Sequence, residues 1–179
     1  MGNKIKMKMA EPSAEYAQQI SEYKEAFVNS RSMAGVGALR EMDDPYEWIR
    51  FSAACKNPDT VPEGLVSATQ YMLVREEDKK ILGMLQLRHR LNDYLEKYGG
   101  HIGYSVAPDE RRKGYASYML DKAFRECRKM GIDRVLITCL NSNEASRRTI
   151  LKNGGVYEST VYEPDKKAFF ERYWIDLSK

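Results

Sequence analysis

Ser105-Val-Ala-Pro-Asp-Glu-Arg-Arg-Lys-Gly-Tyr-Ala116 is the stretch that decides the fold, because it joins a predicted strand to a predicted helix through a cationic loop. Three consecutive cations at 111–113 precede Gly114, whose lack of a side chain lets the backbone approach a ligand closely. The first turn of the next helix has N–H groups without intrahelical partners, at the positive end of the helix dipole. This arrangement predicts a pyrophosphate site. The alternative interpretation is a solvated basic turn, and the local pattern favours neither.

Two other phosphate-binding patterns do not occur in this stretch. A Walker loop requires G-x-x-x-x-G-K-[ST], which is missing from the sequence. A dinucleotide-binding fingerprint requires three glycines, and this loop contains one. The stretch therefore predicts neither a Walker nucleotide site nor a Rossmann dinucleotide site.

Outward from this stretch, alternating and helical patterns of apolar residues predict seven strands and four helices. The strands are expected at 4–9, 69–75, 81–89, 101–106, 135–140, 156–163 and 167–175. The helices are expected after the caps Ser13, Asp44 and Asn143 and over 114–130, with one helical turn at 92–98 and a loop at 31–43. No repeat or linker interrupts this order, so one α/β domain is expected to cover residues 1–179.

Charge and cysteine content narrow the class of protein. The 29 Lys and Arg against 26 Asp and Glu give a net charge of +3, too small an excess to indicate nucleic-acid binding. The three cysteines lack C-x-x-C spacing, which indicates neither a disulfide framework nor a zinc site. The N-terminus lacks the apolar core of a signal peptide, and no apolar run has the length of a membrane span. We expect a cytoplasmic protein with no metal and no membrane or nucleic-acid partner.

Several motifs together resemble the GNAT superfamily of acyl-CoA N-acyltransferases. The phosphate loop of that family reads Gln/Arg-x-x-Gly-x-Gly/Ala, and residues 111–116, Arg-Arg-Lys-Gly-Tyr-Ala, match it. Val106-Ala107-Pro108 resembles the Val-x-Pro that ends the preceding strand, and Asn143 to Gly154 resembles a short helix of the family. Residues 88–92 and 99–106 also resemble a subgroup known only as predicted acetyltransferases. The resemblance therefore supplies no acceptor substrate.

The resemblance implies a fold and a coenzyme. The fold would be α/β, with a mixed central sheet of about six to seven strands, flanking helices and splayed central strands. Acetyl-CoA would be the co-substrate, with pantetheine bound as an added strand at Val106. Asn143 would bond the pantetheine arm, although plain helix capping is its alternative role. The pyrophosphate would lie on Arg111, Arg112, Lys113, Gly114, Tyr115 and Ala116. The 3′-phosphate would meet Arg147, Arg148 or Lys152, each of which is otherwise a solvated helix charge.

The catalytic residues are less clear from the sequence. Many members of the family use as general acid a tyrosine on the helix after the asparagine, and the matching position here is Ile150. Tyr157 is the substitute that we predict, its alternative role being a core aromatic. His101 is the predicted base, because an ordinary histidine pKa near ~6.5 suits proton removal at neutral pH. Both His101 and His89, the second candidate, could equally be structural histidines.

The resemblance predicts an N-acetyltransferase that transfers the acetyl group of acetyl-CoA, by direct attack, to an amine of a small molecule or a protein. Ile150 leaves open a CoA-binding regulatory module without catalysis. The cations at 111–113 leave open a nucleic-acid-binding domain, against which the weak net charge argues. The aromatic residues of the last predicted strand would lie in the core or in the interface of a homodimer, and an amine pocket is their functional alternative.

Overall fold

The computed structural model describes residues 5–30 and 33–179. Three predictions fall partly outside this range: the start of the first strand at residue 4, the N-terminal residues used to argue against a targeting segment, and the first two residues of the loop at 31–43. In the described part of the chain, no helix is long and apolar enough to cross a membrane.

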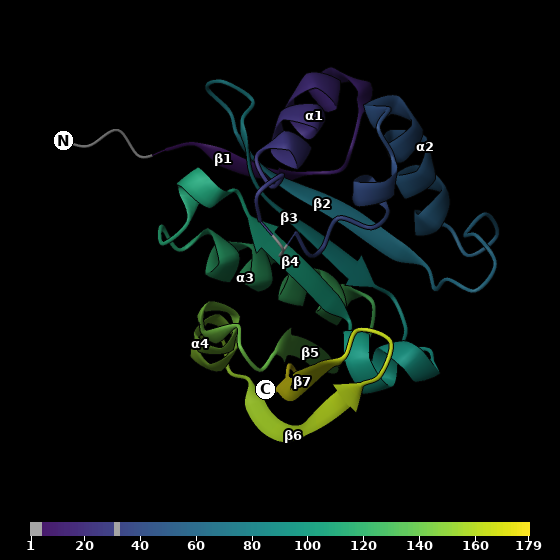
Figure 1. Ribbon diagram of the computed structural model, residues 1–179, viewed down its shortest axis with the longest axis vertical. Coiled ribbons are helices and arrows are strands. Elements are labelled where there is room, and N and C mark those ends of the chain that lie inside the picture. The colour runs from purple at the N-terminus through teal and green to yellow at the C-terminus, as the bar shows by residue number, and fades with distance from the viewer. Residues whose placement is uncertain (1–4, 31–32) are drawn as a thin grey trace.

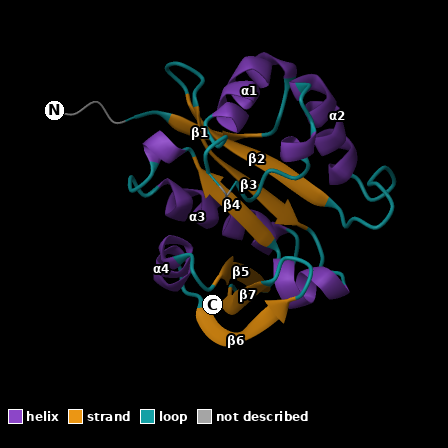
Figure 2. Ribbon diagram, in the orientation of Figure 1, coloured by secondary structure: helices purple, strands orange, loops and turns teal. Residues whose placement is uncertain are grey.

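Seven strands form two antiparallel sheets (Figure 2). The first sheet has the order β1-β2-β3-β4 and comprises Met7–Ala10, Ala68–Arg75, Ile81–Arg88 and Ile102–Val106. The second has the order β5-β7-β6, in which β5 is Arg134–Leu140, β6 is Val156–Glu163 and β7 is Ala168–Asp176. The α/β class and the seven strands are confirmed. The expected single mixed sheet is instead divided in two, and every strand pair in the described residues is antiparallel.

Helices α1 and α2 cover one face of the four-stranded sheet and α3 covers the other, while α4 lies beside the second sheet (Figure 1). Their bounds are Ala17–Glu25, Pro45–Lys56, Tyr115–Lys129 and Glu144–Lys152. Asp44 caps α2 by accepting from the N–H of Tyr46 over 2.9 Å, as predicted. Ser13 differs from the prediction: it precedes a 3₁₀ turn, and its side chain makes no capping bond. The turn expected at 92–98 is a π-helical turn at Leu95–Gly99.

The first sheet separates two hydrophobic cores because successive residues of a strand point to opposite faces. Leu73 and Leu85 pack on the α3 side, together with Met119. Met72 and Met84, their neighbours in sequence, pack under α1 and α2. The sheet is thereby held rigid from both faces, which fixes the position of β4 at its edge.

The two sheets meet at Gly100 and His101, directly before β4. The N–H of His101 donates to the carbonyl of Leu136 on β5 over 2.7 Å, and the N–H of Leu136 donates back to Nδ1 of His101 over 3.0 Å. On the other side, the His101 carbonyl accepts from the N–H of Arg88 on β3 over 2.8 Å. Gly100 forms an isolated bridge to Ile137 with a φ of 69°, where a Cβ would lie 2.5 Å from the Leu136 carbonyl oxygen. Beyond this junction, β4 pairs only with β3 among the described residues.

Burial and the nearby Arg88 guanidinium lower the pKa of His101 to about 4. The side chain is almost inaccessible, with 8% of the residue exposed. Because Nδ1 accepts the Leu136 N–H, the neutral ring carries its proton on Nε2. The fold therefore requires the neutral form of His101.

We predict that His101 makes the protein sensitive to mild acid. A pKa of about 4 when folded and ~6.5 when unfolded means that its stabilisation is complete above pH 6.5 and is lost as the pH falls to 4. This loss is up to about 3 kcal/mol in the free energy of unfolding. His101→Gln should be less stable than wild type at pH 7 and should lose less on acidification, as measured by urea unfolding at pH 7, 5.5 and 4.5.

His89→Gln is the matched control, because His89 is less buried and its ring lies 2.8 Å from the Thr69 hydroxyl, away from the sheet junction. Its unfolding free energy should follow the wild-type pH dependence more closely. Parallel curves for wild type and His101→Gln across this pH range would contradict the assignment.

Candidate active site

A cleft of about 710 Å³ opens between β4, the N-terminus of α3 and the N-terminal half of α4. The loop before α3 and helix α4 lie on the same side of the molecule (Figure 1). Residues predicted from sequence to bind the coenzyme gather there: Val106, Arg111, Arg112, Gly114, Tyr115, Ala116 and Asn143. The other lining residues include Ala34, Tyr104, Ser105, Ser146, Arg148 and Thr149. Segments distant in sequence thus form one concave site.

The loop that enters α3 has the geometry of an anion site. Gly114 is the N-cap residue and has a φ of 83°, a left-handed conformation that side chains rarely adopt. The helix begins at Tyr115, and its first-turn N–H groups face the mouth of the cleft without intrahelical acceptors. No acidic residue occupies the first turn of α3. The positive end of the helix dipole is therefore free to meet an anion.

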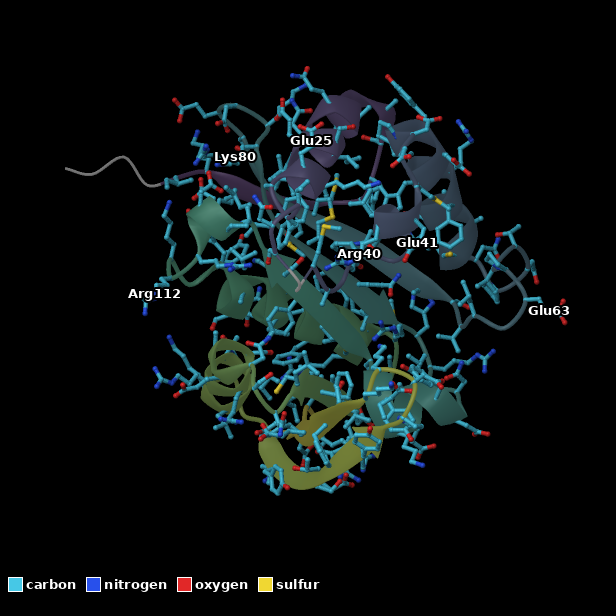
Figure 3. The ribbon with its side chains drawn as sticks, viewed as in Figure 1. Glu25, Arg40, Glu41, Glu63, Lys80 and Arg112 are labelled. Carbon is cyan, nitrogen blue, oxygen red and sulfur yellow. The ribbon has the colours of Figure 1, made fainter. Side chains whose placement is uncertain are left out.

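The three cations of the loop have different environments. Arg112 has a φ of 64° and extends into solvent beside the cleft (Figure 3). The guanidinium of Arg111 lies 5.9 Å from the ring centre of Phe27, and its Nε donates to the Val106 carbonyl over 3.4 Å. Lys113 turns away from the cleft and donates to Glu110 over 2.7 Å. Two of the three predicted cations therefore face the anion site.

The edge of β4 that faces the cleft is open. The N–H of Ala107 donates to Leu82 on β3 over 2.9 Å. Backbone groups alternate in direction along a strand, so those of Val106 and Tyr104 point away from β3 and toward the cleft. An extended amide-containing chain could bond there as an added strand.

Helix α4 forms the opposite wall. The Oδ1 of Asn143 accepts from the N–H of Ser146 over 3.1 Å, so Asn143 caps the helix and lines the cleft as well. Arg147 turns away and binds both carboxylate oxygens of Glu171 at 2.8 Å, whereas Arg148 lines the cleft. Of the two, Arg148 is the one that lines the cleft, where it pairs with Glu144 over 2.5 Å.

Tyr104 also lines the cleft, and the sequence analysis did not single it out. Its hydroxyl lies 2.8 Å from Oγ of Ser146 on α4, and burial raises its pKa to about 12. The phenol is therefore protonated at neutral pH and can donate a hydrogen bond. Alternation along β4 places Tyr104 on the same face as Val106, and this signal could have identified it.

The two predicted catalytic residues do not line the cleft among the described residues. His101 lies at the sheet junction with Nδ1 occupied, and its pKa of about 4 is far below the range that suits a base at neutral pH. Tyr157 is 53% exposed on β6, and its hydroxyl lies 2.8 Å from that of Thr160. This geometry favours structural roles for both, while their catalytic roles stay predictions. Ile150, at the usual position of the acid, is completely buried.

The described residues contain no group of three or more His, Cys, Asp or Glu side chains that could hold a metal ion. Glu144 also lines the cleft and pairs with Arg148. The remaining polar groups of the lining are backbone amides, the Asn143 side chain, arginines, hydroxyls and the Tyr104 phenol. These groups suit an anionic ligand with an extended amide arm.

Comparison with known proteins agrees with this geometry. The sequence model of the acetyltransferase (GNAT) family matches residues 22–154. A search of curated proteins finds no match to this chain. Solved structures share the fold at low sequence identity, including a ribosomal-protein-S5-alanine acetyltransferase from Vibrio fischeri, with a TM-score of 0.71, 16% identity and coverage of 97% of this chain and 94% of that chain.

A protein from Salmonella typhimurium, solved with its cofactor acetyl-CoA, has a TM-score of 0.64 and 16% identity, over 97% of this chain and 95% of that chain. A GnaT-family protein from Bordetella pertussis has a TM-score of 0.69 and 14% identity, over 98% of each chain. The family match includes the sheet junction, the α3 loop and helix α4. The chain therefore belongs to the GNAT acetyltransferase family.

Proposed function

We propose that this protein is an N-acetyltransferase that transfers the acetyl group of acetyl-CoA directly to an amine. The observation that carries the proposal is the cleft, which joins an anion site at Gly114 to the open edge of β4. An anionic diphosphate at the mouth directs the amide-containing arm of the coenzyme along Val106 toward Tyr104. Structures of other proteins with this fold have been solved with acetyl-CoA, which supports the choice of coenzyme.

Within this proposal, each wall of the cleft has a role. The first-turn N–H groups of α3, with Arg111 and Arg112, bind the diphosphate. The outward N–H of Val106, whose carbonyl accepts from Nε of Arg111, donates to a pantetheine amide, and Asn143 also lines the cleft. Arg148 meets the 3′-phosphate. The thioester then lies beside Tyr104 at the inner end.

Direct attack by the amine is favoured over an acyl-cysteine intermediate. The cysteine nearest to α4, Cys139, is 5% exposed, and burial raises the pKa of its thiol to about 11. A thiol with this pKa is protonated at neutral pH, whereas the thiolate is the nucleophile. In this proposal the amine attacks the thioester itself in its neutral form and loses its proton to water. His101, the base predicted from sequence, would first have to release the Leu136 N–H from Nδ1.

We propose that Tyr104 stabilises the departing thiolate by donating a hydrogen bond. Its pKa of about 12 keeps it protonated, and its hydroxyl can leave Ser146 for the coenzyme sulfur. Full proton transfer is not required, because a hydrogen bond to a charged group contributes about 1.5–3 kcal/mol. Tyr104 would thus replace the general acid of the family, a role that the aliphatic side chain of Ile150 cannot have.

Acetyl-CoA should raise the melting temperature of the protein, and adenine alone should not, because adenine lacks the diphosphate and the pantetheine arm. At one hundred times the dissociation constant, the stabilisation is about 2.7 kcal/mol, or roughly 5–10 °C for a chain of this size. Thermal unfolding with and without millimolar ligand measures the shift. An unchanged melting temperature would exclude acetyl-CoA as the coenzyme.

Gly114→Val should abolish the shift caused by acetyl-CoA. A branched side chain at a φ of 83° is strained and stands between the phosphate and the backbone amides. Gly64→Val is the matched control, because Gly64 also has a φ of 83° and open space around its Cβ position. Its neighbour Glu63 lies across the molecule from Arg112 (Figure 3). Both variants should lose similar stability, and only Gly114→Val should lose ligand binding; equal binding by both would mean that the loop is a solvated turn.

Tyr104→Phe should lower kcat about 10–100-fold while the acetyl-CoA dissociation constant stays within a few-fold, because only the hydrogen bond to the leaving thiolate is lost. The measurement is thiol release with an active amine, found by screening a broad panel of amines. Tyr71→Phe is the control, since burial also raises the pKa of Tyr71 to about 12 and it lies on β2, outside the cleft lining. Unchanged kcat in Tyr104→Phe would remove the proposed role. Acetyl-CoA binding without turnover on any amine would favour a regulatory module.

A further inference from the structure

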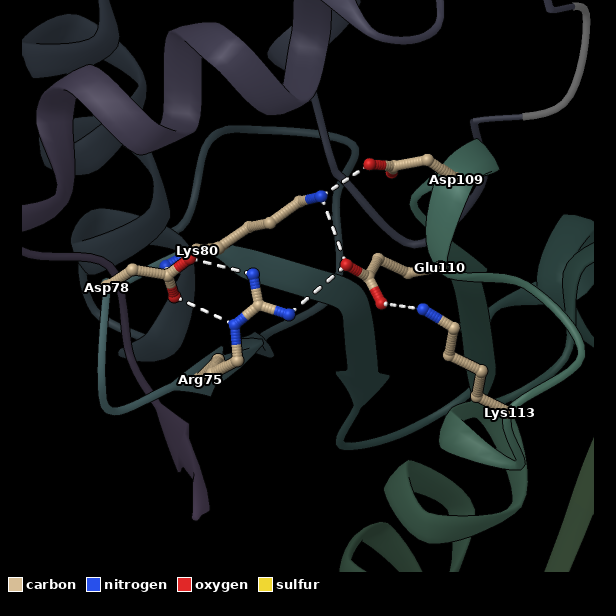
Figure 4. Close-up of polar contacts among 6 residues, drawn as sticks. All are labelled: Arg75, Asp78, Lys80, Asp109, Glu110 and Lys113. Carbon is tan, nitrogen blue, oxygen red and sulfur yellow. Dashed lines mark hydrogen bonds and ion pairs between the residues drawn. The ribbon is translucent and has the colours of Figure 1, made fainter. Parts of the chain in front are cut away.

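Glu110 is a buried carboxylate surrounded by three cations (Figure 4). Only 4% of the residue is exposed. Its Oε1 accepts from Lys80 over 3.0 Å and from Arg75 over 3.3 Å, and its Oε2 accepts from Lys113 over 2.7 Å. Burial alone would raise the pKa of Glu110, but the hydrogen bonds from Lys113 and Lys80 outweigh it and the pKa is lowered. The carboxylate is therefore charged at neutral pH.

Two of these cations belong to the hairpin that joins β2 to β3. Arg75 is the last residue of β2, and Lys80 directly precedes β3. Each is held by a second acid: Asp78 binds Nε and Nη2 of Arg75 at 2.9 and 2.7 Å, and Asp109 pairs with Lys80. Two cations at the end of the first sheet therefore hold the Glu110 carboxylate from one side.

The third cation belongs to the loop that enters α3. Lys113 precedes Gly114 directly, and its bond to Glu110 closes the loop over only three residues. Within it, Arg112 has a φ of 64°, a conformation that costs a non-glycine residue about 1–3 kcal/mol and needs support from its surroundings. The Glu110 carboxylate supplies this support, because it joins the loop to the hairpin.

We propose, resting on the function proposed above, that Glu110 is a positioning residue for the diphosphate of the coenzyme. It holds residues 111–114 in the conformation that presents the first-turn N–H groups of α3, so that the site is formed before the ligand arrives. A preorganised loop avoids the entropy cost of ordering upon binding. Arg75 and Lys80 are its anchor, although neither lines the cleft.

The charge of Glu110 by itself opposes this role. A carboxylate near the loop repels a diphosphate, so neutralising Glu110 without moving the loop would strengthen binding. Loss of the anchor would weaken binding. The two effects have opposite signs, and the direction of the change in affinity therefore separates positioning from simple electrostatics.

The test compares Glu110→Gln with Asp109→Asn. Asp109 is the adjacent residue, also pairs with Lys80 and loses the same charge, but its side chain is 64% exposed and does not touch the loop cation. Calorimetric titration with acetyl-CoA, well below the melting temperature of every variant, should show about ten-fold weaker binding for Glu110→Gln. Asp109→Asn should bind within about two-fold of wild type. Equal or tighter binding by Glu110→Gln would overturn the proposal.

Dephospho-CoA, which keeps the diphosphate and lacks the 3′-phosphate, shows where Glu110 acts. Glu110→Gln should weaken its binding by the same factor as that of acetyl-CoA, and no effect on dephospho-CoA would overturn the proposal. If Glu110 had only a structural role, Glu110→Gln would lower the melting temperature without changing the dissociation constant of acetyl-CoA or of dephospho-CoA at low temperature.

Lys80→Met covers the case in which Glu110→Gln does not fold. It removes one anchor contact on the hairpin side, and about three-fold weaker binding of acetyl-CoA is expected; wild-type affinity would overturn the proposal. Failure of wild type to bind acetyl-CoA would remove the proposed function and this inference together. Normal wild-type binding with no difference between Glu110→Gln and Asp109→Asn would remove this inference alone.

Discussion

The contact between the two sheets at Gly100 and His101 is the constraint on which the rest of the site depends. Two hydrogen bonds join His101 to Leu136, and the left-handed backbone of Gly100 permits the close approach to β5. Because the sheets are held at this end, they can diverge at the other without separating. Among the described residues, no second strand pairs with β4 at Val106, and the cleft lies along this edge. A buried neutral histidine thus allows the protein to keep an open strand edge inside an ordered fold.

The cations of the loop before α3 differ in whether they stabilise the fold or face the cleft. The sequence places three cations in the loop, but the structure commits Lys113 to Glu110 and leaves Arg111 and Arg112 beside the cleft. Fixed backbone amides at the start of α3 do not need to be ordered when the ligand binds, unlike long cationic side chains. The burial of Glu110 costs desolvation energy, which its three partners offset. The charged side chains around Glu110 therefore act mainly by stabilising the conformation of the loop.

Local sequence was sufficient for most of the fold and for most of the predicted coenzyme residues that the structure brings to one cleft. The conformation at Gly114, the strand end at Val106 and the helix start at Asn143 are each determined by neighbouring residues in the sequence. The division into two sheets, the junction role of His101 and the anchoring of Glu110 depend on partners about 30 residues away in the chain. The periodicity of apolar residues does not reveal partners that are this distant in the chain. His101 was therefore predicted to be a base from its chemistry and its place at the start of a strand. Tyr104 differs, because its alternation with Val106 was visible in the sequence, whereas the contact of its phenol with Ser146 on α4 was not.

The structure bears on the amine pocket that the aromatic residues of the last strand were predicted to line. The aromatic rings near the last hairpin already contact cations of the chain itself. Lys166 lies 5.8 Å from the ring centre of Tyr94 and 5.5 Å from that of Phe170, and Arg134 lies 4.8 Å from that of Trp174. A cationic acceptor would have to displace these cation–π contacts. The lost contacts would offset much of the binding free energy that the aromatic rings could offer the acceptor.

The segment between α1 and α2 has a more direct connection with the cleft. Gly35 packs so closely on β4 that a Cβ there would lie 2.3 Å from the Gly103 carbonyl oxygen, and the adjacent Ala34 lines the cleft. Gly35 lies beside the strand that carries Tyr104 and Val106, at the inner end where the acetyl group is proposed to lie. An amine entering over this segment would reach the thioester from the side opposite α4.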